Sequence, residues 1–126
     1  MKDFHHYFFI GAPPADVWNA LTNPVTLHLW TGEPAEMSTE PGTEFTLWDG
    51  SISGRNLQFE AEKKIVQEWY FGGQHEPSVV TITLHPKGRH TSAELSHTNI
   101  PDEDYDDVCQ GWKENYFGTL REFYKD

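Results

Sequence analysis

The seven histidines are the side chains of this sequence best suited to acid–base chemistry or metal binding. His5 and His6 are adjacent on a predicted strand, so they point to opposite faces and cannot serve one site without distortion of the strand. The other five show no HExxH motif and no paired-ligand spacing, and they are His28, His75, His85, His90 and His97. We therefore expect no metal site and no cofactor.

His97 has the strongest case for a functional role. It continues the alternation of Ala93 and Leu95, which predicts that its side chain points inward, near the mouth of a groove. There it would orient a ligand or act as a general base, because the ordinary pKa of histidine is near neutrality. Alternatively, it is a hydrogen-bonded residue at the end of a strand. We favour the second interpretation and assign no catalytic residue.

Other enzyme-type arrangements are missing from the sequence. A cyclase-like site needs an acid or base inside an apolar pocket, but Glu68 and Glu94 alternate away from the inward Trp69 and Leu95. There is no Ser-His-Asp ordering, nucleophile elbow or phosphate-binding glycine loop, and Gly72-Gly73 lacks the flanking pattern of such a loop. A cyclase- or hydrolase-like enzyme, with His97 or a groove carboxylate as general base, remains the alternative hypothesis.

The aromatic residues point more directly to a site. They make up 14% of the chain, and several come from elements that should converge around the groove. The candidate groove residues are Trp30, Phe45, Trp69, Phe71, His97, Trp112 and Tyr116. Trp48 alternates opposite to Phe45, which places it outside. The rings either line a small-molecule pocket or fill the groove themselves, and the sequence does not choose between the two.

Composition limits the partners. With 126 residues, the chain has the size of one domain, spanning 1–126. Nine basic and twenty acidic residues give a net charge of -11, which opposes binding to nucleic acid or to anionic lipid. The single cysteine, Cys109, excludes an intrachain disulfide, and no leader or membrane-spanning apolar segment is present. These features predict a cytoplasmic protein without membrane insertion.

The elements that must position these residues follow from periodicity and turn signals. Residues 4–10, FHHYFFI, are apolar or aromatic on both faces, which predicts a strand covered on both sides. Pro13-Pro14 begins a helix that Asn23-Pro24 ends, and a short second helix follows over residues 25–30. From Ala35 the pattern alternates, with turn signals every eight to twelve residues, which predicts six further strands of an antiparallel meander.

A long helix is predicted after Pro101, where an acidic run complements the positive end of the helix dipole. Its apolar stripe is Tyr105, Val108, Cys109, Trp112, Tyr116, Leu120 and Phe123. Gly111 and Gly118 lie two turns apart on nearly the same face, so we expect them where the helix backbone approaches the sheet or the first helices.

Five segments, in this order and spacing, resemble the C-terminal domain of the activator of the heat-shock protein 90 ATPase: APPADVWNALTNP, GTEFTLWDGSISG, KKIVQEWYF, VVTITL and QGWKENYFGTLREF. The resemblance covers nearly the whole chain. It implies an α+β helix-grip fold, shared with START lipid-binding domains and polyketide cyclases. In that fold a curved seven-stranded antiparallel sheet wraps a long C-terminal helix around a cavity, with two short helices between strands one and two.

The chain departs from the eukaryotic activator in one respect. There a separate N-terminal domain contacts the chaperone and supplies most of the ATPase stimulation, and these residues leave no room for it. The chain resembles instead the bacterial single-domain members of the family. The expected function is therefore non-catalytic binding, either of a hydrophobic small molecule in the groove or of a protein partner. A stress-related chaperone cofactor is a further alternative.

Overall fold

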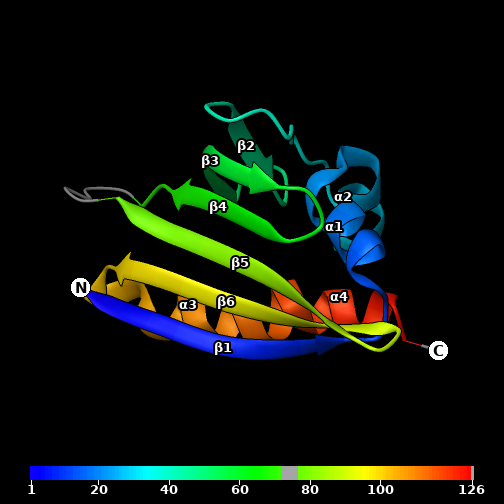
Figure 1. The fold of residues 1–126 in the computed structure, drawn as a ribbon. Helices are drawn as coiled ribbons and strands as arrows, with labels where there is room; N and C mark the ends of the chain where they lie inside the picture. The colour runs from blue at the N-terminus through cyan, green and yellow to red at the C-terminus, as the bar shows by residue number, and fades with distance from the viewer. Residues whose placement is uncertain (72–76, 126) are drawn as a thin grey trace.

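The computed structural model describes residues 1–71 and 77–125 as an antiparallel sheet packed against helices (Figure 1). The described residues contain six strands in the spatial order β1-β6-β5-β4-β3-β2, and every neighbouring pair is antiparallel. The strands are β1 Lys2–Ile10, β2 Glu44–Leu47, β3 Ile52–Glu60, β4 Lys64–Trp69, β5 Ser78–Lys87 and β6 His90–Ile100. The α+β class is confirmed, but the expected seven strands are wrong for this part of the chain.

The segment before β2 is a loop in place of the seventh strand. Glu36 forms one isolated bridge with Thr46, through two backbone hydrogen bonds of 3.0 Å. Farther along, Pro41 lacks the N–H group that a sheet ladder needs. The buried side chain of Asn56 holds the loop instead, donating a hydrogen bond of 3.1 Å to the carbonyl of Ser38. Two backbone hydrogen bonds of 2.7 Å, from Gly42 to Asn56 and from Asn56 to Thr43, also hold the loop. The side chain and backbone of Asn56 thus take the place of a regular ladder.

The two short helices between the first two strands are confirmed as α1 Pro14–Thr22 and α2 Pro24–Thr31. Each has proline in its first turn. Asn23 between them is extended, as expected before proline, and its side chain accepts the N–H of Val25 at 2.9 Å. The left-handed Gly32 ends α2. Local sequence thus fixes the bounds of both helices.

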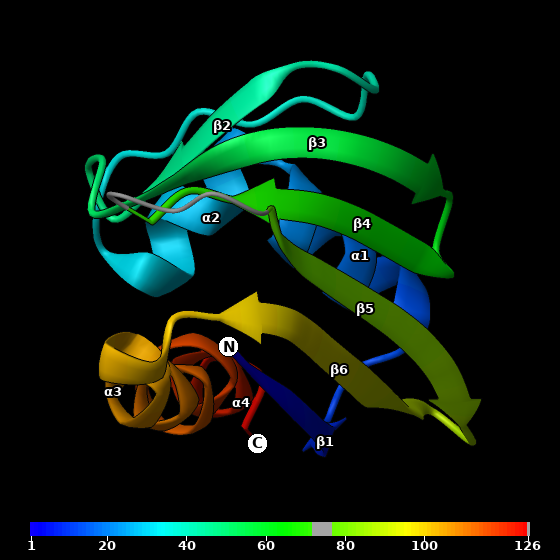
Figure 2. The ribbon, with the colours of Figure 1, turned by 90° about the vertical axis from the view of Figure 1, so that its left-hand side faces the viewer.

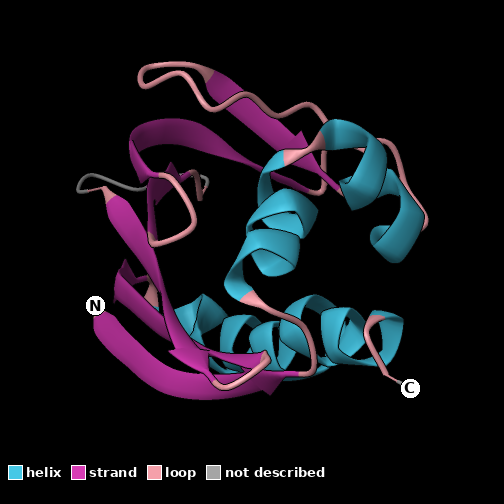
Figure 3. Ribbon diagram, turned by 45° about the vertical axis from the view of Figure 1, so that its right-hand side comes forward, coloured by secondary structure: helices cyan, strands magenta, loops and turns pink. Residues whose placement is uncertain are grey.

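The sheet is strongly curved, and its concave side holds the helices (Figure 2). The C-terminal helix lies along β1 and β6, while α1 and α2 close the other part of the hollow (Figure 3). Buried residues from the sheet and from these helices form one core. Both the curved sheet and the helix seated within it agree with the expected arrangement.

The C-terminal helix, residues 102–123, changes its winding along its length. A 3₁₀ turn and an α-helical segment are followed by one π-helical turn, and then α-helix resumes. The segments are η1 Asp102–Asp104, α3 Tyr105–Gly111, η2 Trp112–Tyr116 and α4 Phe117–Phe123. In the π turn the N–H of Phe117 bonds to the carbonyl of Trp112, five residues earlier. Such turns are frequent at functional sites.

The extra residue of the π turn corrects the predicted apolar stripe. Phe117 is fully buried and stacks on Phe8, with ring centroids 4.4 Å apart. Phe123, expected in the stripe, is 42% exposed, and Tyr124 packs against the core in its place. A constant α-helical period cannot anticipate this shift, because one additional residue rotates every later side chain around the axis.

The expectation for the two helix glycines is wrong. A Cβ atom at Gly111 would meet nothing within 4 Å, so no close approach requires this glycine. A Cβ at Gly118 would lie 2.5 Å from the carbonyl oxygen of Lys113 in the same helix. Gly118 therefore accommodates the π turn, in which the backbone of residue i-5 comes unusually near, and it mediates no contact with the sheet.

β1 is an edge strand with one open face. Phe8 and Ile10 point into the core, whereas Tyr7 and Phe9 are more than half exposed. The prediction of cover on both faces is wrong, because the helices in the described part of the chain lie on the concave side of the sheet (Figures 2 and 3). An aromatic run therefore does not by itself indicate burial on both faces.

The shift in the helix face can be tested by paired truncations. We expect Phe117→Ala to lower the free energy of unfolding by about 3–5 kcal/mol, because it removes a buried, stacked ring. Phe123→Ala should lower it by less than about 1 kcal/mol. Urea denaturation measures both. Equal losses, or the reverse order, would contradict the observed winding.

Candidate functional site

An open pocket of about 590 Å³ lies between the C-terminal helix and the β2–β3 hairpin. Large apolar side chains line much of it: Trp48, Ile52, Phe71, Val108, Trp112 and Tyr116. Polar side chains line the remainder: Thr31, Ser51, Asp104, Asp107, Asn115 and Thr119. An apolar surface with a few polar groups is the usual form of a small-molecule site. A second hollow, near the start of α1, has a volume of about 750 Å³, but no Trp, Tyr or Phe lines it.

Trp48 reaches this pocket through the turn of the hairpin. Trp48, Asp49 and Gly50 all have positive φ values, and the N–H of Ser51 bonds back to the carbonyl of Trp48 at 3.1 Å. Strand alternation ends at Leu47, so the expected outward direction of Trp48 does not apply. The Trp48 ring packs against Trp30 and Tyr116. Placing Trp48 outside was therefore wrong, although the Asp49-Gly50 signal located the turn correctly.

Three of the seven predicted groove residues line the pocket, and four lie behind it. Phe71, Trp112 and Tyr116 form part of the lining. The other four, Trp30, Phe45, Trp69 and His97, are buried in the core and are not part of it. The groove is thus partly filled by its own side chains and partly open. Val108, Asn115 and Thr119 were missed, because exposure along a helix depends on how that helix is seated.

Trp112 and Tyr116 form the innermost wall of the pocket, and further aromatic rings support them from behind. Trp112 stacks on Trp69, with ring centroids 4.7 Å apart and an interplanar angle of 25°. Tyr116 packs on Trp112 at 4.6 Å and meets Trp30 edge-on at 5.4 Å. Trp30 is fixed in turn, since its indole N–H donates to the carbonyl of Ala20 at 2.8 Å. The wall is therefore assembled from the sheet, the C-terminal helix and α2, and it is rigidly supported.

His97 supports Trp112 from behind. The indole N–H of Trp112 donates to Nδ1 of His97 at 2.9 Å, so Nε2 carries the imidazole proton. That Nε2–H group donates to Oγ of Ser78 at 2.6 Å, and the Ser78 hydroxyl donates to the carbonyl of Thr98 at 3.1 Å. Burial lowers the pKa of His97 from 6.5 to about 4, although the negative charge of Asp3 acts in the opposite direction. Both ring nitrogens are occupied, so neither is available as a base toward a ligand.

A second polar chain supports Trp69. Its indole N–H donates to Oε1 of Gln67 at 3.1 Å, and Nε2 of Gln67 donates to Oδ1 of Asn56 at 3.0 Å. Asn56 then holds the loop before β2 through Ser38. The polar atoms of both stacked indoles are therefore satisfied inside the protein. The wall that faces the pocket presents ring faces and few polar atoms.

The hydroxyl of Tyr116 is the exception. The Tyr116 side chain is 4% exposed and lines the pocket. Within residues 1–71 and 77–125, no protein group forms a hydrogen bond with this hydroxyl. Burial raises the pKa of Tyr116, so the hydroxyl stays protonated and can both donate and accept a hydrogen bond. The hydroxyl therefore remains available to an occupant of the pocket.

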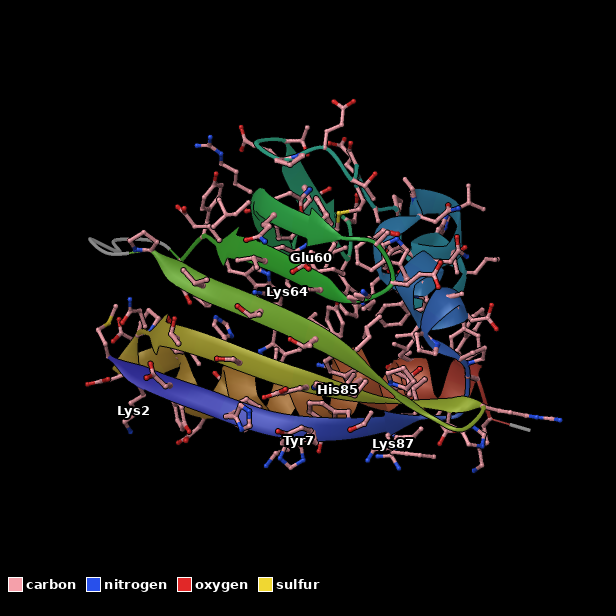
Figure 4. All side chains as sticks on the ribbon, viewed as in Figure 1. Lys2, Tyr7, Glu60, Lys64, His85 and Lys87 are labelled. Carbon is pink, nitrogen blue, oxygen red and sulfur yellow. The ribbon has the colours of Figure 1, made fainter. Side chains whose placement is uncertain are left out.

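The convex face carries a separate histidine–carboxylate cluster. Nε2 of His5 lies 2.8 Å from one oxygen of Glu94, and Nε2 of His85 lies 2.7 Å from the other. These two hydrogen bonds lower the pKa of Glu94 to about 2, and the bond from His5 has the largest effect. Tyr7 and His85 both face outward on this side (Figure 4), with rings 6.5 Å apart. Among the described residues, no group of three or more His, Cys, Asp or Glu side chains could hold a metal ion, and His75 lies outside those residues.

The buried imidazole of His97 predicts acid sensitivity. Its folded pKa, about 4, is below its ordinary 6.5, so the unfolded chain binds the proton first as the pH falls. The neutral imidazole therefore stabilises the fold above pH 6.5, and this contribution is lost as the pH falls from about 6.5 to 4. The loss in the free energy of unfolding is about 3 kcal/mol at most. We expect His97→Gln to be less stable at neutral pH but to lose less stability over this range. Urea denaturation at several pH values, with exposed His28→Gln as control, measures this. An unchanged pH dependence in His97→Gln would refute it.

Comparison with known proteins identifies the family. Residues 11–125 match the model of the family "Activator of Hsp90 ATPase homolog 1-like protein". An activator of 90 kDa heat shock protein ATPase homolog from Dictyostelium discoideum is 31% identical over 111 residues, covering 86% of this chain but 29% of the relative. The chain likewise spans about a third or less of the other curated relatives it matches. None of the helices in the described residues is long and apolar enough to cross a membrane.

Solved structures share the fold. The crystal structure of an HSP90 activator from Plasmodium falciparum is 28% identical and covers 98% of this chain and 96% of its own, with a TM-score of 0.89. CalU16 from Micromonospora echinospora is 25% identical, covering 98% of this chain and 76% of its own, with a TM-score of 0.82. These neighbours have the START and polyketide-cyclase type of fold. The chain therefore belongs to the family of proteins that resemble activator of Hsp90 ATPase homolog 1.

Proposed function

We propose that this chain is a binding module that holds an apolar small molecule in the pocket between the C-terminal helix and the β2–β3 hairpin. The main support is the open volume of about 590 Å³ against a prearranged aromatic wall. Because internal hydrogen bonds already fix the wall, little side-chain entropy is lost when a ligand covers it. The pocket lies within the size range typical of small-molecule sites.

The site geometry favours binding over general-base chemistry. His97 was the candidate base, but it does not line the pocket, and both of its nitrogens are engaged by Trp112 and Ser78. The carboxylates that do line the pocket are Asp104 and Asp107, and neither is fully buried. Neither carboxylate lies inside the closed apolar environment in which a general base is usually found.

Filling the pocket from Gly111 tests this proposal. Gly111 lines the pocket and has free space around its Cα, so Gly111→Leu should project a side chain into the cavity without a clash. Replacing glycine within a helix should also stabilise the fold by about 0.5–1 kcal/mol. Gly111→Ala is the matched control, because it gives a similar helix effect but fills little of the pocket.

The measurement is a thermal-shift and native mass spectrometry screen against fatty acids, sterols, polyketide-like aromatic compounds and aromatic amines. We expect at least one class to be retained by the native chain and by Gly111→Ala, and to be lost or weakened at least tenfold in Gly111→Leu. Retention of no compound by the native chain would refute the proposal. Equal retention by Gly111→Leu would show that the ligand lies elsewhere, and would also refute it.

Family membership favours a second function, that of a chaperone cofactor. The curated relatives include proteins named as activators of the 90 kDa heat-shock protein ATPase, and a structural neighbour that is 28% identical is titled an HSP90 activator. A single module of this type would bind the chaperone in the cytoplasm, where activators of this kind act. The chain covers only part of the curated relatives, so ATPase stimulation is less strongly supported than association.

Titration calorimetry and an ATPase assay with heat-shock protein 90 from the same organism test the second function. We expect association at micromolar concentration, together with a change in ATP turnover that grows with the concentration of the chain. Gly111→Leu should retain this association if the chaperone does not use the pocket. The absence of both association and any turnover change at high micromolar concentration would remove this function.

A further inference from the structure

The described charged side chains on the polar side of the pocket are all acidic. Asp104 and Asp107 line it, and no Lys, Arg or His is among its described lining residues. Both aspartates come from the start of the C-terminal helix. Asp102, one turn away, is paired with the N-terminal ammonium at 2.8 Å. By contrast, neither Asp104 nor Asp107 has an ion-pair partner within residues 1–71 and 77–125.

The aromatic wall has the same electrostatic preference. Ring faces of Trp and Tyr carry partial negative charge and attract ammonium and guanidinium groups. Trp48, Trp112 and Tyr116 all line the pocket, and the ring centroid of Tyr116 lies 5.8 Å from that of Trp48 and 4.6 Å from that of Trp112. A cation entering between the aspartates would therefore meet favourable fields from the carboxylates and from the rings, whereas an anion would meet neither.

The hydroxyl of Tyr116, which borders the pocket, provides an independent sign that a ligand binds here. It is a polar group on a side chain that is 4% exposed, it borders the pocket, and it has no hydrogen-bond partner among the described residues. Because no described protein group occupies this hydroxyl, a ligand in the pocket can supply its hydrogen-bond partner. An ammonium N–H group can donate to it.

We propose that the pocket takes small organic cations, in which an aromatic or alicyclic body carries an ammonium group. This inference rests on the function proposed above and names the class of its ligand. The body covers Trp112 and Ile52, the charge lies near Asp104 and Asp107, and one polar hydrogen reaches Tyr116. Simple fatty acids and other carboxylates are disfavoured in the pocket.

Three probes of nearly the same shape separate the contribution of charge from that of the apolar body. They are 1-naphthylmethylammonium, the neutral 1-naphthalenemethanol and the anionic 1-naphthylacetate, each titrated calorimetrically at low salt and again at high salt. We expect the ammonium to bind about fivefold to tenfold more tightly than the alcohol, and the carboxylate to bind more weakly than both. High salt should reduce the advantage of the ammonium, since the aspartates lie near the surface.

The double variant Asp104→Asn/Asp107→Asn should bind the alcohol as the native chain does and lose the preference for the ammonium. Glu103→Gln/Asp106→Asn is the matched control, because it removes the same charge from the same helix start at positions outside the pocket lining. The control should keep most of the preference. Tyr116→Phe should weaken binding of the ammonium probe about threefold or more. It should not lower thermal stability, since no internal hydrogen bond is broken.

The outcomes separate this inference from the proposed function. If the alcohol binds but all three probes have equal affinity, or if both double variants behave alike, the assignment of a cationic ligand is overturned and pocket binding stands. If none of the probes binds, including the alcohol, the proposed function is overturned together with this inference. If the preference for the ammonium disappears only in Asp104→Asn/Asp107→Asn, the assignment of a cationic ligand is supported.

Discussion

The stack of Trp69 on Trp112 is the contact on which the rest of the structure depends. Trp69 belongs to the sheet and Trp112 to the C-terminal helix, and their rings lie 4.7 Å apart. Each indole N–H would be costly if buried without a partner. Two internal chains satisfy them, one through His97 and Ser78 and the other through Gln67 and Asn56. These chains fix the orientation of both rings and thereby the position of the helix.

The winding of the helix follows from the same constraint. Trp112 and Tyr116 form the two ends of the π turn, and the extra residue lets both rings meet the sheet side while Phe117 packs on Phe8. Gly118 makes room for the carbonyl of Lys113 that this turn brings close. A local departure from α-helical geometry thus increases the aromatic surface that one short segment directs into the hollow of the sheet.

Structural and functional roles are divided between the two sides of this aromatic wall. On the inner side, His97 and Gln67 have their hydrogen bonds completed and hold the rings. On the outer side, Trp48, Tyr116 and the rim aspartates border open space. The residues with the most reactive side chains therefore support the site, and the residues that border it offer shape, ring faces and negative charge. Such an arrangement suits the binding role proposed for the pocket.

The sequence by itself determined the elements whose signals are local. Pro14, Asn23-Pro24 and Asp49-Gly50 set the helix bounds and the hairpin, because proline fixes φ and glycine permits positive φ wherever they occur. Alternation of apolar residues placed Val80, Ile82, Ala93 and Leu95 correctly in the core. The family resemblance then supplied the curved sheet around the helix.

Only the tertiary structure decided which residues border the pocket. Trp48 entered it through a left-handed turn conformation, and Phe117 replaced Phe123 in the core because a π turn interrupted the helical period. The supposed seventh strand became a loop, held by the side chain of Asn56. His97, the candidate general base, is a buried support because the indole N–H of Trp112 donates to its Nδ1. Each outcome depends on contacts between residues far apart in the chain, and local periodicity contains no information about such contacts.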